Sequence, residues 1–266
     1  MPAQPLISCL MVTLPVPTRL EGLKRSLACY TGQTHARREL VLVLNGGDAD
    51  AAAAVEAHVA SFGRGDIRVL APGGTLTLGA LRNLSLGAAR GEVVCQWDDD
   101  DLHHPERLRR QLAALAESGA EGVCPQEVMQ FFPAERGLYC HNWRATEATA
   151  FPGALMAWTR APIEYPETGE AARLGEDLEV VRQLRRRDGL GVLAGAPHLY
   201  VYVSHGGNSW NADHHRMLAT SLGLSRGLLR RREAALRDGL SAFDFGPDAV
   251  TVQGANGPAF TIAARG

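Results

Sequence analysis

Four consecutive aspartates, Asp98, Asp99, Asp100 and Asp101, follow the apolar segment 93–97. Like charges this close repel one another, so the run is costly unless a cation or a helix N-terminus compensates it. Carboxylates are preferred ligands of hard divalent cations, and Mg²⁺ or Mn²⁺ often bridges them to a substrate's phosphates. The alternative is a solvated acidic loop that caps the helix expected near Pro105. The position after a buried strand favours the metal interpretation, because α/β sheets bind ligands there.

A second acidic pair, Glu176 and Asp177, stands near the start of a helix predicted over residues 174–188. A carboxylate here could accept the proton of a hydroxyl that attacks a substrate. The alternative is favourable charge at a helix N-terminus.

His205 ends an apolar segment and precedes a Gly-Gly-Asn-Ser turn, whose backbone amides could face an anion. A lone histidine is more often structural, and the turn makes both interpretations about equally strong.

Two histidine pairs, His103-His104 and His214-His215, lack the i, i+4 spacing that a helical metal site needs. We expect both pairs on the surface.

The first half of the chain alternates strands and helices. Short apolar runs predict the strands, and apolar positions three and four residues apart predict the helices. The strands are expected at 6–12, 40–44, 66–70 and 93–97, and the helices at 19–31, 49–62, 78–90 and 105–117. This order indicates an α/β fold with a mostly parallel central sheet flanked by helices. Thr13, Asn45 and the aspartate run all follow strands, so we expect them to line one cleft.

The second half is less regular. Strands are expected at 122–132, 138–143, 153–158 and 198–204, and a long helical stretch at 212–237, with a break near Gly223 or Gly227. The weak strand signals at 249–253 and 259–263 have no predicted place. We expect one domain over 1–266, made of a donor half (5–118), an acceptor half (119–240) and a C-terminal extension (241–266).

Composition and charge bear on the partners and the location of the protein. A net charge of −2 gives no general attraction to nucleic acid. Five scattered cysteines and an N-terminus without signal-peptide features favour the cytoplasm. The basic segment from Arg226 to Arg237 could touch an anionic membrane if the acceptor is lipid-linked, although a solvated helix face is the commoner explanation.

The motifs, taken in order, resemble family 2 glycosyltransferases of the GT-A fold over about residues 5–118. The resemblance rests on the first strand, a Gln-Thr pair, a helix with Arg-Asn, an A-x-G-E turn, a D-x-D motif and a Pro-x-x-Leu helix start. In this sequence these are residues 7–13, Gln33-Thr34, Arg82-Asn83, Ala89-Arg90-Gly91-Glu92, Asp98-Asp99-Asp100 and Pro105-Glu106-Arg107-Leu108.

The resemblance implies a role for each matching residue. Asp100 would bind the metal, Asp98 the donor ribose or a metal-bound water, and Asp101 is a further metal candidate. Arg82 would lie near the donor diphosphate, and His205 near the diphosphate or the metal. The Glu176-Asp177 pair resembles the motif that supplies the general base of inverting members, with Asp177 our choice and Glu176 the fallback.

Two turns depart from the family pattern. Thr13-Leu14-Pro15 replaces the usual T-Y-N-R turn, and Asn45-Gly46-Gly47 replaces an acidic turn that contacts the nucleobase. Asn45 would meet a base with a donor as well as an acceptor. We place Thr13, Leu14, Asn45 and Asp99 with the expected donor-binding residues.

The resemblance implies an Mn²⁺- or Mg²⁺-dependent enzyme that moves a sugar from a nucleotide diphosphate sugar to a saccharide or lipid-linked acceptor, with inversion. Three alternatives remain. A non-catalytic nucleotide-sugar binding protein would lack a working base. A nucleotidyltransferase should carry a glycine-rich loop after the first strand. A phosphohydrolase would need a lysine in its site, yet Lys24 is the only lysine.

Overall fold

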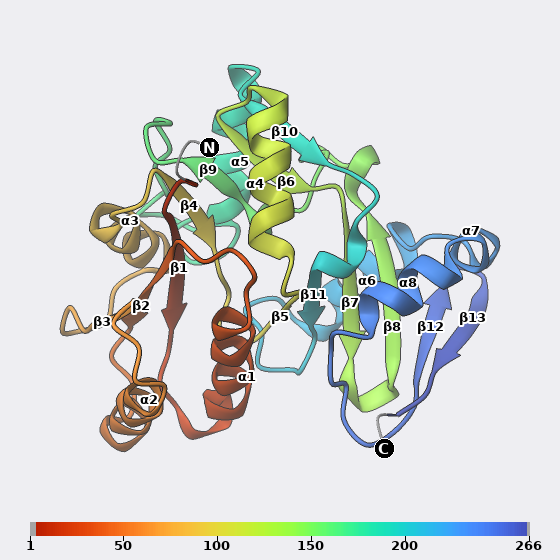
Figure 1. Ribbon diagram of the computed structural model, residues 1–266, viewed down its shortest axis with the longest axis horizontal. Helices are drawn as coiled ribbons and strands as arrows, with labels where there is room; N and C mark the ends of the chain where they lie inside the picture. Colours follow the sequence, from red (N-terminus) through yellow and green to blue (C-terminus); the bar gives the residue numbers. More distant parts are fainter. Residues whose placement is uncertain (1–3, 265–266) are drawn as a thin grey trace.

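The computed structural model describes residues 4–264 and contains two β-sheets that lie side by side in Figure 1. The first sheet has seven strands in the order β10-β6-β9-β4-β1-β2-β3. Its strands are β1 (Ile7–Thr13), β2 (Arg38–Leu44), β3 (Ile67–Leu70), β4 (Val93–Gln96), β6 (Gly122–Pro125), β9 (Met156–Trp158) and β10 (Leu190–Leu193). Strands β4, β1, β2 and β3 are parallel, and β9 runs antiparallel between β4 and β6.

The second sheet has six strands in the order β13-β12-β8-β7-β11-β5. They are β5 (Leu102–His103), β7 (Glu127–Phe132), β8 (Gly137–Asn142), β11 (Tyr200–Val203), β12 (Val250–Gly254) and β13 (Gly257–Ile262). Strand β5 follows the aspartate run directly and pairs with β11. The acidic segment therefore connects the end of β4 in the first sheet to the edge of the second.

Eight α-helices flank the sheets over the described residues 4–264. They are α1 (Leu20–Thr31), α2 (Ala49–Ser61), α3 (Leu78–Ala88), α4 (Arg107–Ser118), α5 (Glu176–Arg186), α6 (Ala212–Ser221), α7 (Arg226–Arg231) and α8 (Glu233–Leu240). Five short 3₁₀ turns supplement them: Pro17–Arg19, Pro133–Glu135, Trp143–Ala145, Pro152–Ala154 and Pro197–Leu199. None of the described helices is long and apolar enough to cross a membrane.

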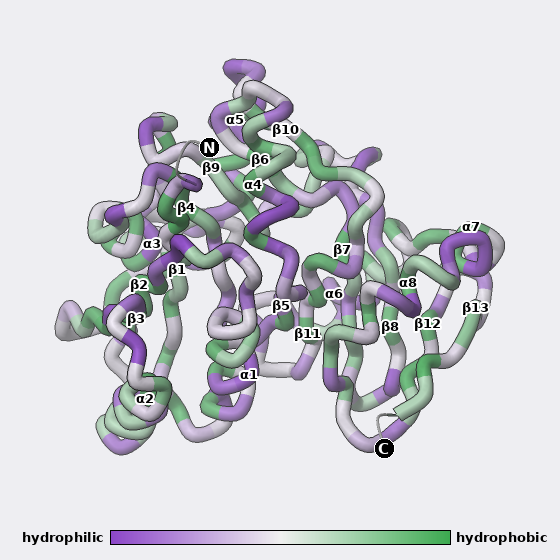
Figure 2. Tube along the Cα trace, in the orientation of Figure 1, coloured by the Kyte–Doolittle hydropathy of each residue, from purple (hydrophilic) through white to green (hydrophobic). Residues whose placement is uncertain are grey.

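Apolar strands at the centre of the first sheet form the main core. Strand β2 is buried along its whole length, and β4 is buried at every position. Figure 2 shows these strands mostly green, whereas α7 beside β13 is purple, because it carries the arginines of the basic segment. Parallel strands covered on both faces need such continuous apolar runs.

The α/β fold and the strand-helix order of the first half are confirmed, and the structure corrects one expectation of the second half and completes two others. The single strand expected over 122–132 is two strands, β6 and β7, which belong to different sheets. Gln126 lies between them, and its backbone bonds toward both sheets: the amide donates to Leu193 at the end of β10, and the carbonyl accepts from Trp143 just after β8. The long helical stretch is broken at residues 222–225, as expected near Gly223, and again at Arg232, so it forms three helices. The two weak strand signals are strands, and they extend the second sheet beside β8. A periodic pattern alone does not show where a chain changes sheets.

Candidate active site

Each of the four aspartates after β4 has different partners. The two that are matched to the D-x-D motif are only partly buried. Asp98 accepts from Arg82 Nη2 at 2.7 Å and from the Tyr200 hydroxyl at 3.1 Å. Asp100 accepts from Arg19 Nη2 at 3.0 Å, and its Oδ2 lies 3.0 Å from His205 Nε2. The chain bends at Asp99, Asp100 and Asp101, so the four carboxylates reach different surroundings.

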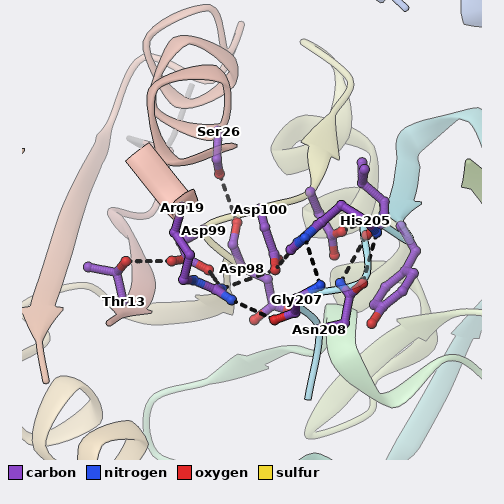
Figure 3. A network of polar contacts seen from close by, with 12 residues as sticks. Thr13, Arg19, Ser26, Asp98, Asp99, Asp100, His205, Gly207 and Asn208 are labelled. Atoms are coloured by element: carbon purple, nitrogen blue, oxygen red, sulfur yellow. Dashed lines mark hydrogen bonds and ion pairs between the residues drawn. The ribbon is translucent and has the colours of Figure 1, made fainter. Parts of the chain in front are cut away.

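The other two aspartates are buried and hold the segment in place. Asp99 accepts from Arg19 Nη2 at 2.6 Å and from the Thr13 hydroxyl at the end of β1. Asp101 is 0% exposed and accepts from the Val203 amide at 2.7 Å and from the Tyr200 hydroxyl. These contacts join the run to β1 on one side and to β11 on the other, as Figure 3 shows for Thr13 and Asp99.

Arg19 bridges the acidic run to a loop far along the chain. Its Nη2 contacts Asp99 and Asp100, and its Nη1 donates to the carbonyl of Gly207 at 3.1 Å. The loop is held by Asn208, which accepts from the His205 amide at 3.0 Å and donates to Val203 at 2.9 Å. Figure 3 shows Arg19, Asp100 and His205 converging on one another. The G-G-N-S turn thus positions the His205 ring beside Asp100.

A cavity opens at this end of the first sheet. Its lining includes the three aspartates 98–100, both arginines that pair with them, and the Glu176-Asp177 pair: Val12, Arg19, Leu78, Arg82, Gln96, Asp98, Asp99, Asp100, Leu174, Gly175, Glu176, Asp177, Tyr202, Asn208, Ser209 and Trp210. Residues as far apart in the sequence as Val12 and Trp210 therefore share one cleft.

The two members of the Glu176-Asp177 pair have different surroundings at the start of α5. Glu176 is buried, and its Oε1 lies 3.4 Å from Arg82 Nε. Asp177 is partly exposed, and its Oδ1 accepts from the Leu178 amide at 2.8 Å. Arg82 thus contacts Glu176 and Asp98 together, and Asp177 has no cationic partner among the described residues within salt-bridge distance.

Burial and neighbouring charge shift the titration of the acids. Burial, and then the charges of Glu176 and Asp98, raise the pKa of Asp177 to about 7. Burial and the charge of Asp100 likewise raise the pKa of Asp99 to about 6. Burial opposes ionisation of Asp100 too, but its contacts with His205 and Arg19 outweigh burial and lower its pKa. Asp177 is therefore the acid whose charge state changes near neutral pH and whose oxygens face the cleft.

Some expected site residues lie outside this cavity. Leu14 is 44% exposed, and neither it nor Asn45 lines the cleft. The Asn45 amide bonds in both directions with the backbone of Leu76, so it ties β2 to the loop before α3. Thr13 touches the site through Asp99.

The expected surface position of the histidine pairs is wrong for one member of each pair. His103 and His215 are buried. His103 packs against Trp97 and contacts Arg107 through Nδ1 at 2.6 Å. His215 packs against Tyr202. Sequence spacing excludes a helical two-histidine metal site, but it does not reveal which histidine faces the core.

Sequence reasoning also missed residues that organise the site. The first of these residues is Arg19. The sequence indicates only that a basic residue stands just before the helix that follows β1. Tyr200 is the second, and Arg107 is the third. Arg107 is fully buried, donates to the Gln96 carbonyl at 2.8 Å and lies over the rings of Trp97 and Tyr200. Nothing in the local pattern of Arg107 distinguishes it from a solvated helix arginine.

Asp100 and His205 form the pair that fits a divalent metal. A carboxylate and an imidazole both suit Mn²⁺, and a 3.0 Å separation between their facing atoms shows that they converge. Over residues 4–264 no group of three potential ligands gathers, so phosphate and water would have to complete the coordination, as is usual for metals that bind with nucleotides. A metal on Nε2 would put the ring proton on Nδ1, which now accepts from the Gly207 amide at 3.2 Å, so that contact must break.

Comparison with known proteins identifies the family and the fold. Residues 12–146 match the family described as Glycosyl transferase family 2. The structure is similar to residues 1–349 of S. aureus TarS, with 15% identity and a TM-score of 0.57 over 90% of this chain and 70% of that one. The same TarS fragment in complex with UDP-GlcNAc gives 16% identity and a TM-score of 0.59 over 88% of this chain and 66% of that one.

A further similar structure is the mannosyltransferase PcManGT from Pyrobaculum calidifontis in complex with GDP-Man and Mn²⁺. Identity is 16% and the TM-score is 0.59, over 90% of this chain and 64% of that one. The chain thus spans less than two thirds of that mannosyltransferase. No curated protein sequence matches the chain. The fold is that of the GT-A glycosyltransferases.

The contact between Tyr200 and Asp101 predicts a loss of stability. Tyr200→Phe removes the hydroxyl that donates to the buried Asp101, so the free energy of unfolding should fall by about 1–3 kcal/mol. Urea unfolding near pH 7 measures the change. Tyr139→Phe, at a partly exposed position on β8, is the matched control and should change stability by less than about 0.5 kcal/mol. Equal unfolding midpoints for the Tyr200 variant and the wild type would contradict the assigned role.

Proposed function

The chain belongs to glycosyl transferase family 2, and we propose that it transfers a sugar from a nucleotide diphosphate sugar to an acceptor hydroxyl, with inversion at the anomeric carbon. One observation carries the proposal. The D-x-D aspartates, Arg82 and Asp177 line a single cavity at the carboxyl ends of β1 and β4. A donor, its leaving group and a base can therefore meet there.

Charge balance supports a metal in the proposed reaction. The cavity gathers six carboxyl groups around two arginines, counting the buried Asp101: Asp98, Asp99, Asp100, Asp101, Glu176 and Asp177 against Arg19 and Arg82. Adding an anionic diphosphate to such a site is unfavourable without a further cation. We propose that Asp100 and His205 hold Mn²⁺ or Mg²⁺. The metal would act as a Lewis acid toward the departing diphosphate.

Both arginines still have hydrogen-bonding capacity for the donor. Arg82 Nη1 and Arg19 Nε are buried without a hydrogen-bond partner within residues 4–264. Burial alone would lower the pKa of Arg82, but Asp98 and Glu176 outweigh burial and raise the pKa, so the guanidinium stays charged. In this proposal Arg82 meets the diphosphate while its other nitrogens keep Asp98 and Glu176 in place. Buried donors left without partners are costly, so a phosphate oxygen would relieve that cost.

Asp177 is the proposed general base. Its oxygens accept the acceptor proton while the acceptor oxygen forms its bond to the anomeric carbon. The bond from that carbon to the diphosphate breaks in the same displacement, which inverts the centre. Glu176 suits the role less well, because its carboxylate is buried against Arg82.

The metal assignment predicts a change in donor binding. The Asp100→Ala variant should lose the Mn²⁺ dependence of UDP or GDP binding, because Asp100 and the phosphates would share the ion. Thermal-shift titrations of both nucleotides, with and without Mn²⁺, measure this dependence. Asp50→Ala removes an exposed acid of α2 and is the matched control. Undiminished metal dependence in the Asp100 variant would refute the assignment.

The base assignment predicts the effect of pH on turnover. Asp177 must be deprotonated to accept a proton and its pKa is raised to about 7, so turnover should rise with pH through that value and fall below it. Glu176, Asp98 and Arg82 are the charged groups that face Asp177 and set this step. Asp177→Asn keeps the shape without the basicity, so turnover should fall by ~10²-fold or more and the pH step should vanish.

Glu176→Gln tests the assignment within the pair. It should reduce turnover less than Asp177→Asn and should keep the pH step. A larger loss in the Glu176 variant would transfer the role of base to Glu176. Full activity in both variants would mean that the pair is only a helix start.

A further inference from the structure

A second cavity, of about 280 Å³, adjoins the first. It lies between α5, α6 and the strands β7, β8 and β11 of the second sheet. Asp98, Gly175, Asp177, Tyr202 and Trp210 line both cavities. Asp177 therefore stands where the two cavities meet, with the cluster of acids and arginines on one side and this second cavity on the other.

Buried polar atoms without partners gather around the second cavity. Twelve buried side-chain nitrogen or oxygen atoms have no hydrogen-bond partner within residues 4–264, and four of them belong to residues that line this cavity. They are Gln130 Oε1, His141 Nε2, Trp143 Nε1 and His215 Nδ1. Gln130, His141 and His215 are 2%, 2% and 4% exposed. An unpaired buried polar atom is unfavourable, so such a concentration in one place indicates a ligand that supplies the missing partners.

The remaining wall is aromatic and apolar. The rings of Trp143 and Phe151 lie 5.4 Å apart, those of Phe151 and Tyr202 6.3 Å, and those of Tyr202 and His215 5.1 Å. The four rings follow one another along the lining, and two of them, Trp143 and His215, also carry unpaired atoms. A ligand that fits this lining presents an apolar face together with hydroxyl or amide groups at its edge. A sugar ring has this combination, with a face of C–H groups and an equator of hydroxyls.

The charge of the cavity excludes an anionic ligand. Among the described residues that line it, none is a lysine or an arginine, and Asp98 and Asp177 are its charged groups. Burial and the neighbouring His215 lower the pKa of His141 to about 3, and burial also lowers the pKa of His214 and His215. The histidines are therefore neutral at physiological pH. A hydrocarbon chain is excluded for a different reason, because it would leave the four polar atoms unpaired.

We propose that this second cavity binds a ring of a neutral saccharide, which presents the acceptor hydroxyl to Asp177. The assignment of that hydroxyl rests on the proposed function, because it takes Asp177 as the base, whereas the binding of the saccharide rests on the cavity alone. Free sugars and the terminal sugar of a lipid-linked chain share the chemistry that the cavity recognises. Sugars that carry phosphate or carboxylate do not.

Calorimetric titration of the full chain tests the proposal. The probes are methyl glycosides of glucose, galactose, mannose, N-acetylglucosamine and N-acetylgalactosamine. Glucose 6-phosphate, methyl glucuronide and hexanol represent the charged and apolar alternatives. Each is titrated with and without UDP or GDP and Mn²⁺, because the nucleotide can order the cavity first. We expect at least one neutral glycoside to bind, and the charged sugars and hexanol to bind at least about tenfold more weakly.

Two variants connect the binding to the unpaired atoms. Trp143→Phe removes the unpaired Nε1, and His141→Phe removes both ring nitrogens, of which Nε2 is the unpaired one. Both variants keep an aromatic ring, and each should weaken glycoside binding by about tenfold. Thermal unfolding without saccharide checks that each variant is folded at the titration temperature, because both substitutions also change the packing: Trp143→Phe removes ring volume beside Phe151, and His141 is buried. The matched control is His58→Phe on α2, far along the chain from this cavity, which removes the same two nitrogens, of which Nε2 is likewise unpaired. It should bind glycosides as the wild type does.

The outcomes separate this proposal from the proposed function. Nucleotide binding without any glycoside binding would overturn the saccharide cavity and leave the donor site intact. Glycoside binding without any nucleotide binding would support the cavity and count against the transferase. Stronger binding of the charged sugars or of hexanol, or wild-type affinity in both aromatic variants, would also overturn the proposal. If His141→Phe fails to fold, Trp143→Phe decides alone.

Discussion

The repulsion among four consecutive carboxylates is the constraint on which the site depends. The structure meets it by giving each aspartate its own set of partners, in which Arg19 is shared by Asp99 and Asp100, and Tyr200 by Asp98 and Asp101. The further partners are Arg82 for Asp98, Thr13 for Asp99, His205 for Asp100 and the Val203 amide for Asp101. These partners come from β1, the turn before α1, α3, β11 and the loop that follows it. Compensating the charge therefore draws distant segments to one place, and two aspartates remain partly exposed to the cavity.

Each of the two sheets positions a different part of the proposed site. The first sheet supplies the parallel strands whose carboxyl ends form the nucleotide side of the proposed site. The second sheet contributes Gln130, His141 and Tyr202 to the adjoining cavity, through β7, β8 and β11, and α6 and the neighbouring loops add the other aromatic residues. Asp177 is the second residue of α5 and lies at the boundary between them, without a cationic partner within salt-bridge distance among the described residues. A base with a raised pKa is best placed there, because it must reach an acceptor without losing its proton affinity to an arginine.

The sequence predicted the first half well because its signals are local. Continuous apolar strands, amphipathic helices and the order of motifs from Arg82 to Leu108 need no knowledge of distant contacts. The second half depended on tertiary contacts. The change of sheet at Gln126 and the buried positions of His103, His215 and Arg107 follow from packing partners that lie far along the chain. The role of Arg19 could not be predicted either, because its carboxylate partners are 80 and 81 residues away along the chain.

Anomalous diffraction from crystals grown with Mn²⁺ and UDP or GDP tests the central claim most directly, because it locates the ion without assuming any residue's role. The account predicts one Mn²⁺ peak within bonding distance of Asp100 Oδ2 and His205 Nε2, with Arg19 withdrawn from Asp100 and Asp98 still paired with Arg82. A peak held by Asp98 and Asp101, or a bound nucleotide without Mn²⁺ at the acidic run, would contradict it.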